Sequence, residues 1–166
     1  MITRVYRGFR KPLLWWLYRK VYAIDECMPF YSFMFTDSCK YDNGDEQGDW
    51  NKLYGISNSL NPHLFSYRIA WRYLKEEDVF ELAPYYYDKG ICYIYYNRHK
   101  VVANVKFITY IEFDNVKREV IFNVDDKELL KLLNVPRPLC FKELGLYIGG
   151  TCKAKHTMKF KRRRIL

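Results

Sequence analysis

The chain of 166 residues lacks the features that would place it in several large classes of protein. It has no run of about 18 apolar residues, so we expect no membrane-spanning helix and no membrane partner. Residues 13–18 are apolar and follow basic residues, but this stretch is too short for a secretory signal and has no small-residue cleavage site. Five cysteines, an odd number, form no Cys-x-x-Cys pair, which argues against a disulfide framework and a zinc module. A reducing cytoplasm suits this composition.

The sequence also lacks the short motifs that identify known classes of enzyme. It has no glycine-rich phosphate loop, G-x-S-x-G elbow, H-E-x-x-H helix or kinase signature. The histidines His63, His99 and His156 are far apart and have no ligand partners at metal-binding spacing. The acidic stretch within residues 37–50 does not have the spacing of an EF-hand loop. We therefore predict no cofactor, no metal and no catalytic residue, and a binding protein rather than an enzyme.

What the chain has in abundance is aromatic side chains. Aromatics make up 19% of the residues, with 16 Tyr and 11 Phe, and the hydrophobic fraction of 49% excludes a disordered chain. The length favours a single domain over residues 1–166. Aromatic residues are enriched in strands, so the composition predicts an all-β fold.

Positive charge is concentrated at the two ends. The net charge is +9, yet residues 1–20 contain six basic side chains and residues 151–166 contain seven, with no acidic residue in either segment. Residues 21–150 hold 15 basic and 19 acidic side chains, so the middle of the chain is mildly acidic. The two ends either form one basic patch, able to bind nucleic acid or another anion, or are separate solvated margins.

The pattern of side chains predicts a series of short strands. Residues 66–73 alternate strictly, which puts Arg68 and Arg72 on one face and Tyr67, Ile69, Trp71 and Tyr73 on the other. We predict strands at 30–35 and 157–164, and two hairpins, 79–87 with 91–96 and 101–113 with 118–124. One short helix is predicted at 125–133, begun by an aspartate N-cap and ended by Pro136. Residues 12–21 read equally as helix or strand. The expected architecture is a two-sheet antiparallel sandwich of jelly-roll character.

The segment from residue 51 to residue 72 is the richest in binding groups. Its donors, Lys52, His63, Ser66, Arg68 and Arg72, suit phosphate or carboxylate oxygens, because guanidinium and ammonium groups bind oxyanions strongly. Aromatic side chains that stack on a base or a sugar are available close to them in the sequence or in the next strands: Trp71, Tyr85 and Tyr87. A polar outer face with arginines lying over rings is the structural alternative.

At these positions the chain resembles a group of small phage-encoded and prophage-encoded proteins. The resemblance rests on "DWNKLYGIS", "HLFSYRIAWRY" and "LYIGGTCKAKH" and covers roughly residues 30–160. It implies a β-sandwich that sequesters a nucleotide immune signal, an anti-defence sponge in the host cytoplasm. Lys155 departs from the pattern, which has proline there. The matching residues are Asn51, Lys52, Gly55, His63, Ser66, Arg68, Trp71, Arg72, Gly149, Gly150 and Thr151.

Three functions follow as hypotheses. The first is a non-catalytic binder of a small anionic ligand, a cyclic or linear nucleotide. The second is a nucleic-acid-binding protein that uses the basic termini, and the third is a carbohydrate-binding or lyase-like jelly roll, which rests on fold analogy. Because a sandwich exposes edge strands and this chain is rich in aromatics, we also predict a homodimer or a higher closed oligomer with the site near the interface.

Overall fold

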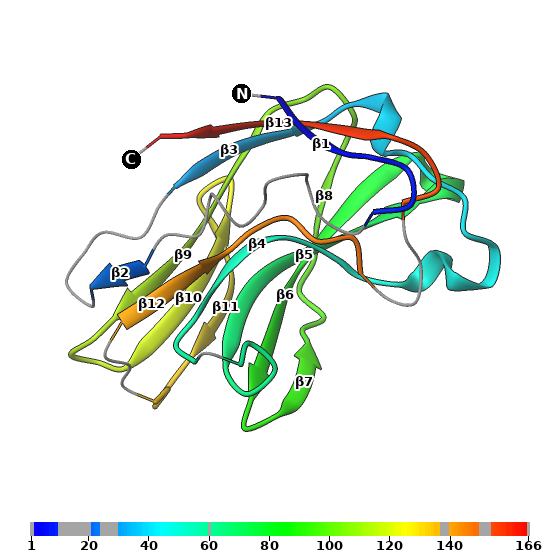
Figure 1. Cartoon of the computed structure of the whole chain (residues 1–166). Coiled ribbons are helices and arrows are strands. Elements are labelled where there is room, and N and C mark those ends of the chain that lie inside the picture. The colour runs from blue at the N-terminus through cyan, green and yellow to red at the C-terminus, as the bar shows by residue number, and fades with distance from the viewer. Residues whose placement is uncertain are drawn as a thin grey trace.

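The computed structural model describes residues 2–9, 21–23, 30–59, 61–136, 140–149 and 154–165. Their strands form two antiparallel sheets that pack against each other (Figure 1). In spatial order, the six-stranded sheet contains β1 (Ile2–Val5), β13 (Met158–Arg164), β3 (Tyr31–Phe35), β9 (Phe107–Asp114), β10 (Glu119–Val124) and β11 (Lys127–Leu132). The seven-stranded sheet contains β2 (Val21–Ala23), β12 (Cys140–Leu144), β4 (Asn51–Ser57), β5 (Ser66–Leu74), β6 (Val79–Asp88) and β7 (Ile91–Ile94), and β8 (His99–Val101) also pairs with β6. The predicted sandwich is thus confirmed.

Aromatic rings from both sheets fill the space between them. Phe35 of β3 lies 4.3 Å from Phe80 of β6, 4.9 Å from Trp71 of β5 and 5.4 Å from Phe107 of β9, measured between ring centroids. The alternation predicted for residues 66–73 is confirmed, because Trp71 and the other three residues of its face are buried. The opposite face of β5 therefore carries Arg68 and Arg72 away from the core.

The helix predicted at residues 125–133 is wrong. This segment is the strand β11, and Asp125 and Asp126 form a two-residue turn between β10 and β11, with Val124 paired to Lys127. Both aspartates have positive φ, 47° and 59°, as a type I′ hairpin turn requires, and aspartate tolerates this conformation. The pair therefore starts a strand rather than capping a helix, and Leu129 still reaches the core.

Both predicted hairpins are present, and one begins later than expected. β6 and β7 pair around Lys89 and Gly90, which have φ values of 50° and 87°. In the second hairpin β9 begins at Phe107, since Val101 belongs to β8 and pairs with Phe80. Between them Asn104 has a φ of 64° and reverses the chain. The polar stretch 37–50 contains two short 3-10 turns, η2 (Asp37–Cys39) and η3 (Gly44–Gly48), and a third, η4 (Lys75–Glu77), joins β5 to β6.

The two basic ends of the chain lie together. β1 and β13 are neighbouring strands of the six-stranded sheet, with Arg4 directly opposite Lys159 (Figure 1). The alternatives for residues 12–21 concern positions outside the described residues, apart from Val21, which begins β2. Within the described part of the chain, no helix is long and apolar enough to span a bilayer.

Candidate functional site

A cleft of about 590 Å³ lies on the face of the seven-stranded sheet that is turned away from the core. Its floor comes from β4, β5, β6 and β7, and its rim comes from the turns before β4 and after β12. The lining residues used below are Asp49, Trp50, Lys52, His63, Arg68, Tyr85, Tyr87, Cys92 and Tyr147. Four of these side chains are aromatic and two are basic, whereas Asp49 is the cleft's one acidic side chain among the described residues.

Lys52 is the first buried cation of the cleft. Its side chain is 9% exposed, its Nζ donates a hydrogen bond to the Trp50 carbonyl oxygen at 2.7 Å, and the same atom lies 4.3 Å from the centroid of the Tyr85 ring. Burial and the nearby charge of Arg68 lower the pKa of Lys52 to about 8. The Lys52 ammonium therefore loses its proton at a pH of about 8 rather than at 10.5.

Arg68 is the second cation of the cleft and is half-buried. On β5 it lies between Gly55 of β4 and Tyr85 of β6. A Cβ atom on Gly55 would stand 2.6 Å from the Arg68 Cγ atom and 2.3 Å from the Tyr67 carbonyl oxygen, so only glycine leaves room for this arginine. Burial lowers the pKa of Arg68, and its Nε has no hydrogen-bond partner.

Neither cation has a carboxylate ion-pair partner among the described residues, although the charge of Asp49 favours the charged form of Lys52. The charge of Arg68 lowers the pKa of Lys52, since two like charges share a poorly hydrated site. Buried charges are normally paired, so an unpaired set beside a cleft indicates that an anion is the missing partner.

Tyrosines surround the two cations. The Tyr85 hydroxyl lies 3.3 Å from the Tyr87 hydroxyl, and the Tyr87 ring meets the His63 ring edge-on at 5.1 Å. Burial, followed by the Cys92 thiol and the Tyr87 hydroxyl, raises the pKa of Tyr85. Tyr147 joins the rim because its backbone exchanges two hydrogen bonds with Lys52, at 2.7 and 2.8 Å. The Tyr85 hydroxyl is therefore protonated near neutral pH and is able to donate a hydrogen bond.

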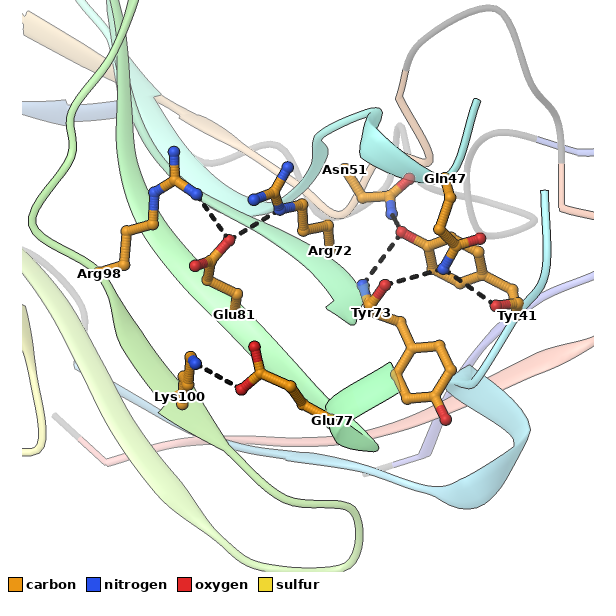
Figure 2. Close-up of polar contacts among 9 residues, drawn as sticks. All are labelled: Tyr41, Gln47, Asn51, Arg72, Tyr73, Glu77, Glu81, Arg98 and Lys100. Carbon is orange, nitrogen blue, oxygen red and sulfur yellow. Dashed lines mark hydrogen bonds and ion pairs between the residues drawn. The ribbon is translucent and has the colours of Figure 1, made fainter. Parts of the chain in front are cut away.

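Arg72 lies on the same face as Arg68 but has a carboxylate partner. Its Nε is 2.7 Å from Glu81 Oε2, and Arg98 reaches the same oxygen at 2.9 Å (Figure 2). The Arg72 guanidinium also lies 4.6 Å from the Trp50 ring centroid. Arg72 thus has a carboxylate partner and lies over the Trp50 ring, and its direct contact with a ligand stays a prediction.

The loop before β4 is fixed by a second set of polar contacts. Asn51 Nδ2 donates to the Tyr41 hydroxyl at 3.1 Å, and Gln47 Nε2 donates to the Tyr73 carbonyl oxygen at 2.8 Å (Figure 2). Asn51 Oδ1 accepts a hydrogen bond from the Gly149 backbone N–H at 2.8 Å. Asn51 therefore holds the rim in position from a buried site rather than contacting a ligand.

The structure brings together five of the predicted site residues, namely Lys52, His63, Arg68, Tyr85 and Tyr87. Trp71 is fully buried in the core, because it is on the inner face of β5, and its predicted ligand contact is excluded. Ser66 is also buried and does not line the cleft. Gly150 and Thr151 lie outside the described residues.

Trp50, Tyr147, Asp49 and Cys92 line the cleft but were not expected there. Asp49, Trp50 and Tyr147 belong to "DWNKLYGIS" and "LYIGGTCKAKH", two of the segments that carry the resemblance, and this was the signal for them. No sequence signal pointed to Cys92. In the described part of the chain, no group of three His, Cys, Asp or Glu side chains is placed to hold a metal ion.

Comparison with known proteins defines the class of fold. No protein-family model and no curated protein matches the chain. Among solved structures it is similar to the alginate lyase AlyC3, with a TM-score of 0.54 and 15% identity over 99% of this chain and 70% of that one. The complex of AlyC3 with dimannuronate gives 0.50 and 14% over the same shares. LamAcat from Zobellia galactanivorans gives 0.49 and 9% over 87% of this chain and 65% of that one. The likeness to AlyC3 shows the fold alone, a jelly-roll β-sandwich.

Proposed function

We propose that the protein is a jelly-roll carbohydrate-binding protein whose cleft takes an acidic oligosaccharide. The observation that carries the proposal is a pair of cations with no carboxylate ion-pair partner, the buried Lys52 and the half-buried Arg68, at the floor of a cleft walled by tyrosines. A uronate carboxylate is a planar oxyanion that accepts hydrogen bonds from both groups and supplies the negative charge they lack. Neutralising the buried Lys52 and the half-buried Arg68 at once favours a carboxylate over a neutral sugar.

The rest of the cleft suits a sugar ring. The Tyr85 and Tyr87 rings are tilted at 65° to each other, and their centroids are 5.7 Å apart. They therefore present hydroxyls and ring edges to a ligand, and a flat base cannot stack between them. Asp49 on the rim can accept hydrogen bonds from sugar hydroxyls. Trp50 is already covered by the Arg72 guanidinium and is not a free stacking platform.

The fold adds support of a coarser kind. AlyC3 is described as an alginate lyase and was solved with dimannuronate, a chain of two uronates. At 15% identity this likeness carries no residue of that enzyme over to this chain. It does make a uronate the first ligand to test.

Capture of a nucleotide immune signal is the competing proposal. Its phosphates would meet the same Lys52 and Arg68, so charge alone does not separate the two ligands. The tilted tyrosines favour the sugar, because a nucleobase gains most from a parallel ring. The calorimetric titration described below therefore includes nucleotides. The expected homodimer or higher closed oligomer stays a prediction, which light scattering on the same sample tests.

The proposal is one of binding. Elimination from a uronate needs a base at the carbon beside the carboxylate, and the raised pKa of Tyr85 makes this hydroxyl a proton donor near neutral pH. His63, on the cleft rim, supplies the imidazole that is the candidate base. Ultraviolet absorbance of unsaturated product, compared between the wild type and His63→Ala, tests for turnover in the same samples.

The deciding experiment is calorimetry with oligomannuronates and oligoguluronates of two to six sugars. Neutral oligosaccharides of equal length, cyclic dinucleotides and trinucleotides and adenosine-ribose compounds form the comparison panel. We expect heat with the uronates and a loss of binding in Arg68→Met, whereas Arg163→Met, the same change on the other sheet, retains it. Binding of nucleotides without uronates would replace this proposal, and no heat with any compound would remove it.

A further inference from the structure

The outer surface of the six-stranded sheet gathers cations from both ends of the chain. Arg4 of β1 lies opposite Lys159 of β13, and Lys161 and Arg163 follow at alternate positions of β13. Lys106 lines the same surface hollow as Lys161 and Arg163, a hollow of about 710 Å³. We call these five exposed residues, Arg4, Lys106, Lys159, Lys161 and Arg163, the basic face.

The basic face has no internal compensation. Among the described residues, none of its five cations forms an ion pair, whereas Lys40, Lys75 and Lys100 elsewhere each have a carboxylate within 3 Å. The carboxylate in the hollow, Asp125, accepts a hydrogen bond from the Ile108 N–H at 2.7 Å. Its other oxygen lies 3.4 Å from His99 Nε2. Like charges directly opposite each other destabilise a strand pair, so the arrangement of Arg4 and Lys159 costs stability and points to an anionic partner.

The spacing of the cations on the basic face favours a polyanion with closely spaced negative charges. Lys159 and Arg163 are about 13 Å apart along the strand, and the distance from β1 to β9 is about 14 Å across three strand spacings. Double-stranded nucleic acid carries one negative charge per ~1.7 Å of axis, or about eight over 13 Å. A polyuronate carries at most one charge per sugar ring and presents fewer charges to the same area.

The residues between the cations favour double-stranded over single-stranded nucleic acid as the partner. Those on the outer side are aliphatic or small, namely Ile2, Ser32, Met34 and Ile108, whereas the two phenylalanines that also line the hollow, Phe33 and Phe107, are buried in the core. Binding of single strands relies on aromatic rings that stack on exposed bases, and the side chains on the outer side offer none. Duplex backbones require only positive charge that reaches phosphate oxygens.

We propose that the basic face binds the phosphate backbone of double-stranded nucleic acid without reading its base sequence. This surface is on the other sheet from the cleft, so the two sites are separate and the inference does not depend on the proposed sugar ligand. Each cation that meets a phosphate releases a counterion, and the logarithm of affinity then falls by about 0.9 per contact for each tenfold rise in salt.

The test is fluorescence anisotropy with a labelled 25-base-pair duplex in 50 to 200 mM KCl. With five contacts we expect a slope near −4.5 and an affinity loss of about 500-fold over this range. Lys161→Gln/Arg163→Gln removes two contacts, so its slope is expected to fall to about −2.7. Its matched control, Lys89→Gln/Lys127→Gln, changes two exposed lysines that do not belong to the basic face and should keep the wild-type slope.

Four outcomes would overturn the proposal. They are no duplex binding at 50 mM KCl, equal slopes for the wild type and Lys161→Gln/Arg163→Gln, tighter binding to the single strand than to the duplex, and retention on anionic vesicles or a polyuronate in place of the duplex. Because all the changed side chains are exposed, circular dichroism and the Tm should match the wild type. Oligouronate titration of Lys161→Gln/Arg163→Gln tests independently whether the cleft still binds its proposed ligand.

Discussion

Arg68 and Arg72 stand four residues apart on one face of one strand, yet their surroundings differ. Arg72 faces Glu81 across the β5–β6 pairing, and a second arginine, Arg98, shares that carboxylate (Figure 2). Arg68 faces Tyr85 at the corresponding position and has Lys52 as its charged neighbour. One end of the strand is an ion-pair cluster that fixes Trp50, and the other is a cationic cleft.

The difference shows how the same residue type serves structure at one end and binding at the other. A buried charge with a partner is stable as it is, whereas a buried charge without one carries a desolvation cost that a ligand can offset. Residues that favour function at the expense of stability are expected at such sites. The following changes separate the two ends, starting with the largest expected effect.

Gly55→Ala should remove the space that Arg68 occupies. The new Cβ would lie 2.3 Å from the Tyr67 carbonyl oxygen, so β4 and β5 must separate, and we expect a loss of about 4 kcal/mol in the free energy of unfolding. Urea denaturation measures it. Gly145→Ala, whose Cβ meets nothing within 4 Å, is the control and should change little. Equal effects of the two changes would contradict the close approach at Gly55.

Glu81→Gln should remove the ion pairs that Arg72 and Arg98 form with Glu81 at one end of β5. Arg72 and Arg98 would keep their charges and lose their shared carboxylate, and because both are partly exposed we expect a loss of about 2–3 kcal/mol in unfolding free energy. Release of the Trp50 ring should appear as a shift in tryptophan fluorescence. Unchanged stability would mean that the cluster contributes nothing net. Glu77→Gln, at the exposed pair with Lys100, is the control and should cost under 1 kcal/mol.

Arg68→Met should separate binding from stability. We expect oligouronate affinity to fall by about 2 kcal/mol, roughly 30-fold, because a charge-assisted contact is lost. Thermal stability should stay the same or rise, since a half-buried charge without an ion-pair partner is removed. Arg72→Met should behave in the opposite way, lowering the Tm more than the affinity. Calorimetry and thermal melts on both variants make the comparison, which fails if both arginines affect the same quantity.

The pH dependence of Lys52 gives the smallest effect. Its pKa is about 8 in the folded chain and 10.5 when unfolded, so between these pH values the unfolded state binds more protons and stability rises with pH. We expect a gain of roughly 1 to 2 kcal/mol across that range in urea denaturation. Affinity for an anionic sugar should fall over the same range as the ammonium is lost. Lys52→Met should abolish the contribution of Lys52 to both trends, and a variant with unchanged curves would contradict this assignment.

Much of the fold could be predicted because strand signals are local. Alternation over residues 66–73 placed both arginines outside and Trp71 inside, and Lys89 with Gly90 marked the turn of a hairpin. The wrong helix shows the limit of local signals. Asp125 and Asp126 are good residues both for an N-cap and for a type I′ turn, and pairing of β11 with β10 decided between them.

The sequence by itself determined the β-rich class, the outward face of β5, and the concentration of positive charge in the two terminal segments. Only the tertiary structure decided which arginine is paired, because the register of β5 against β6 sets Glu81 opposite Arg72 and Tyr85 opposite Arg68. The pairing of β1 with β13 made the two basic ends one surface, and the contact of Tyr147 with Lys52 closed the cleft. These contacts join residues far apart in the chain, and the free energy that selects them comes from burying the aromatic core between the sheets, which no local pattern contains.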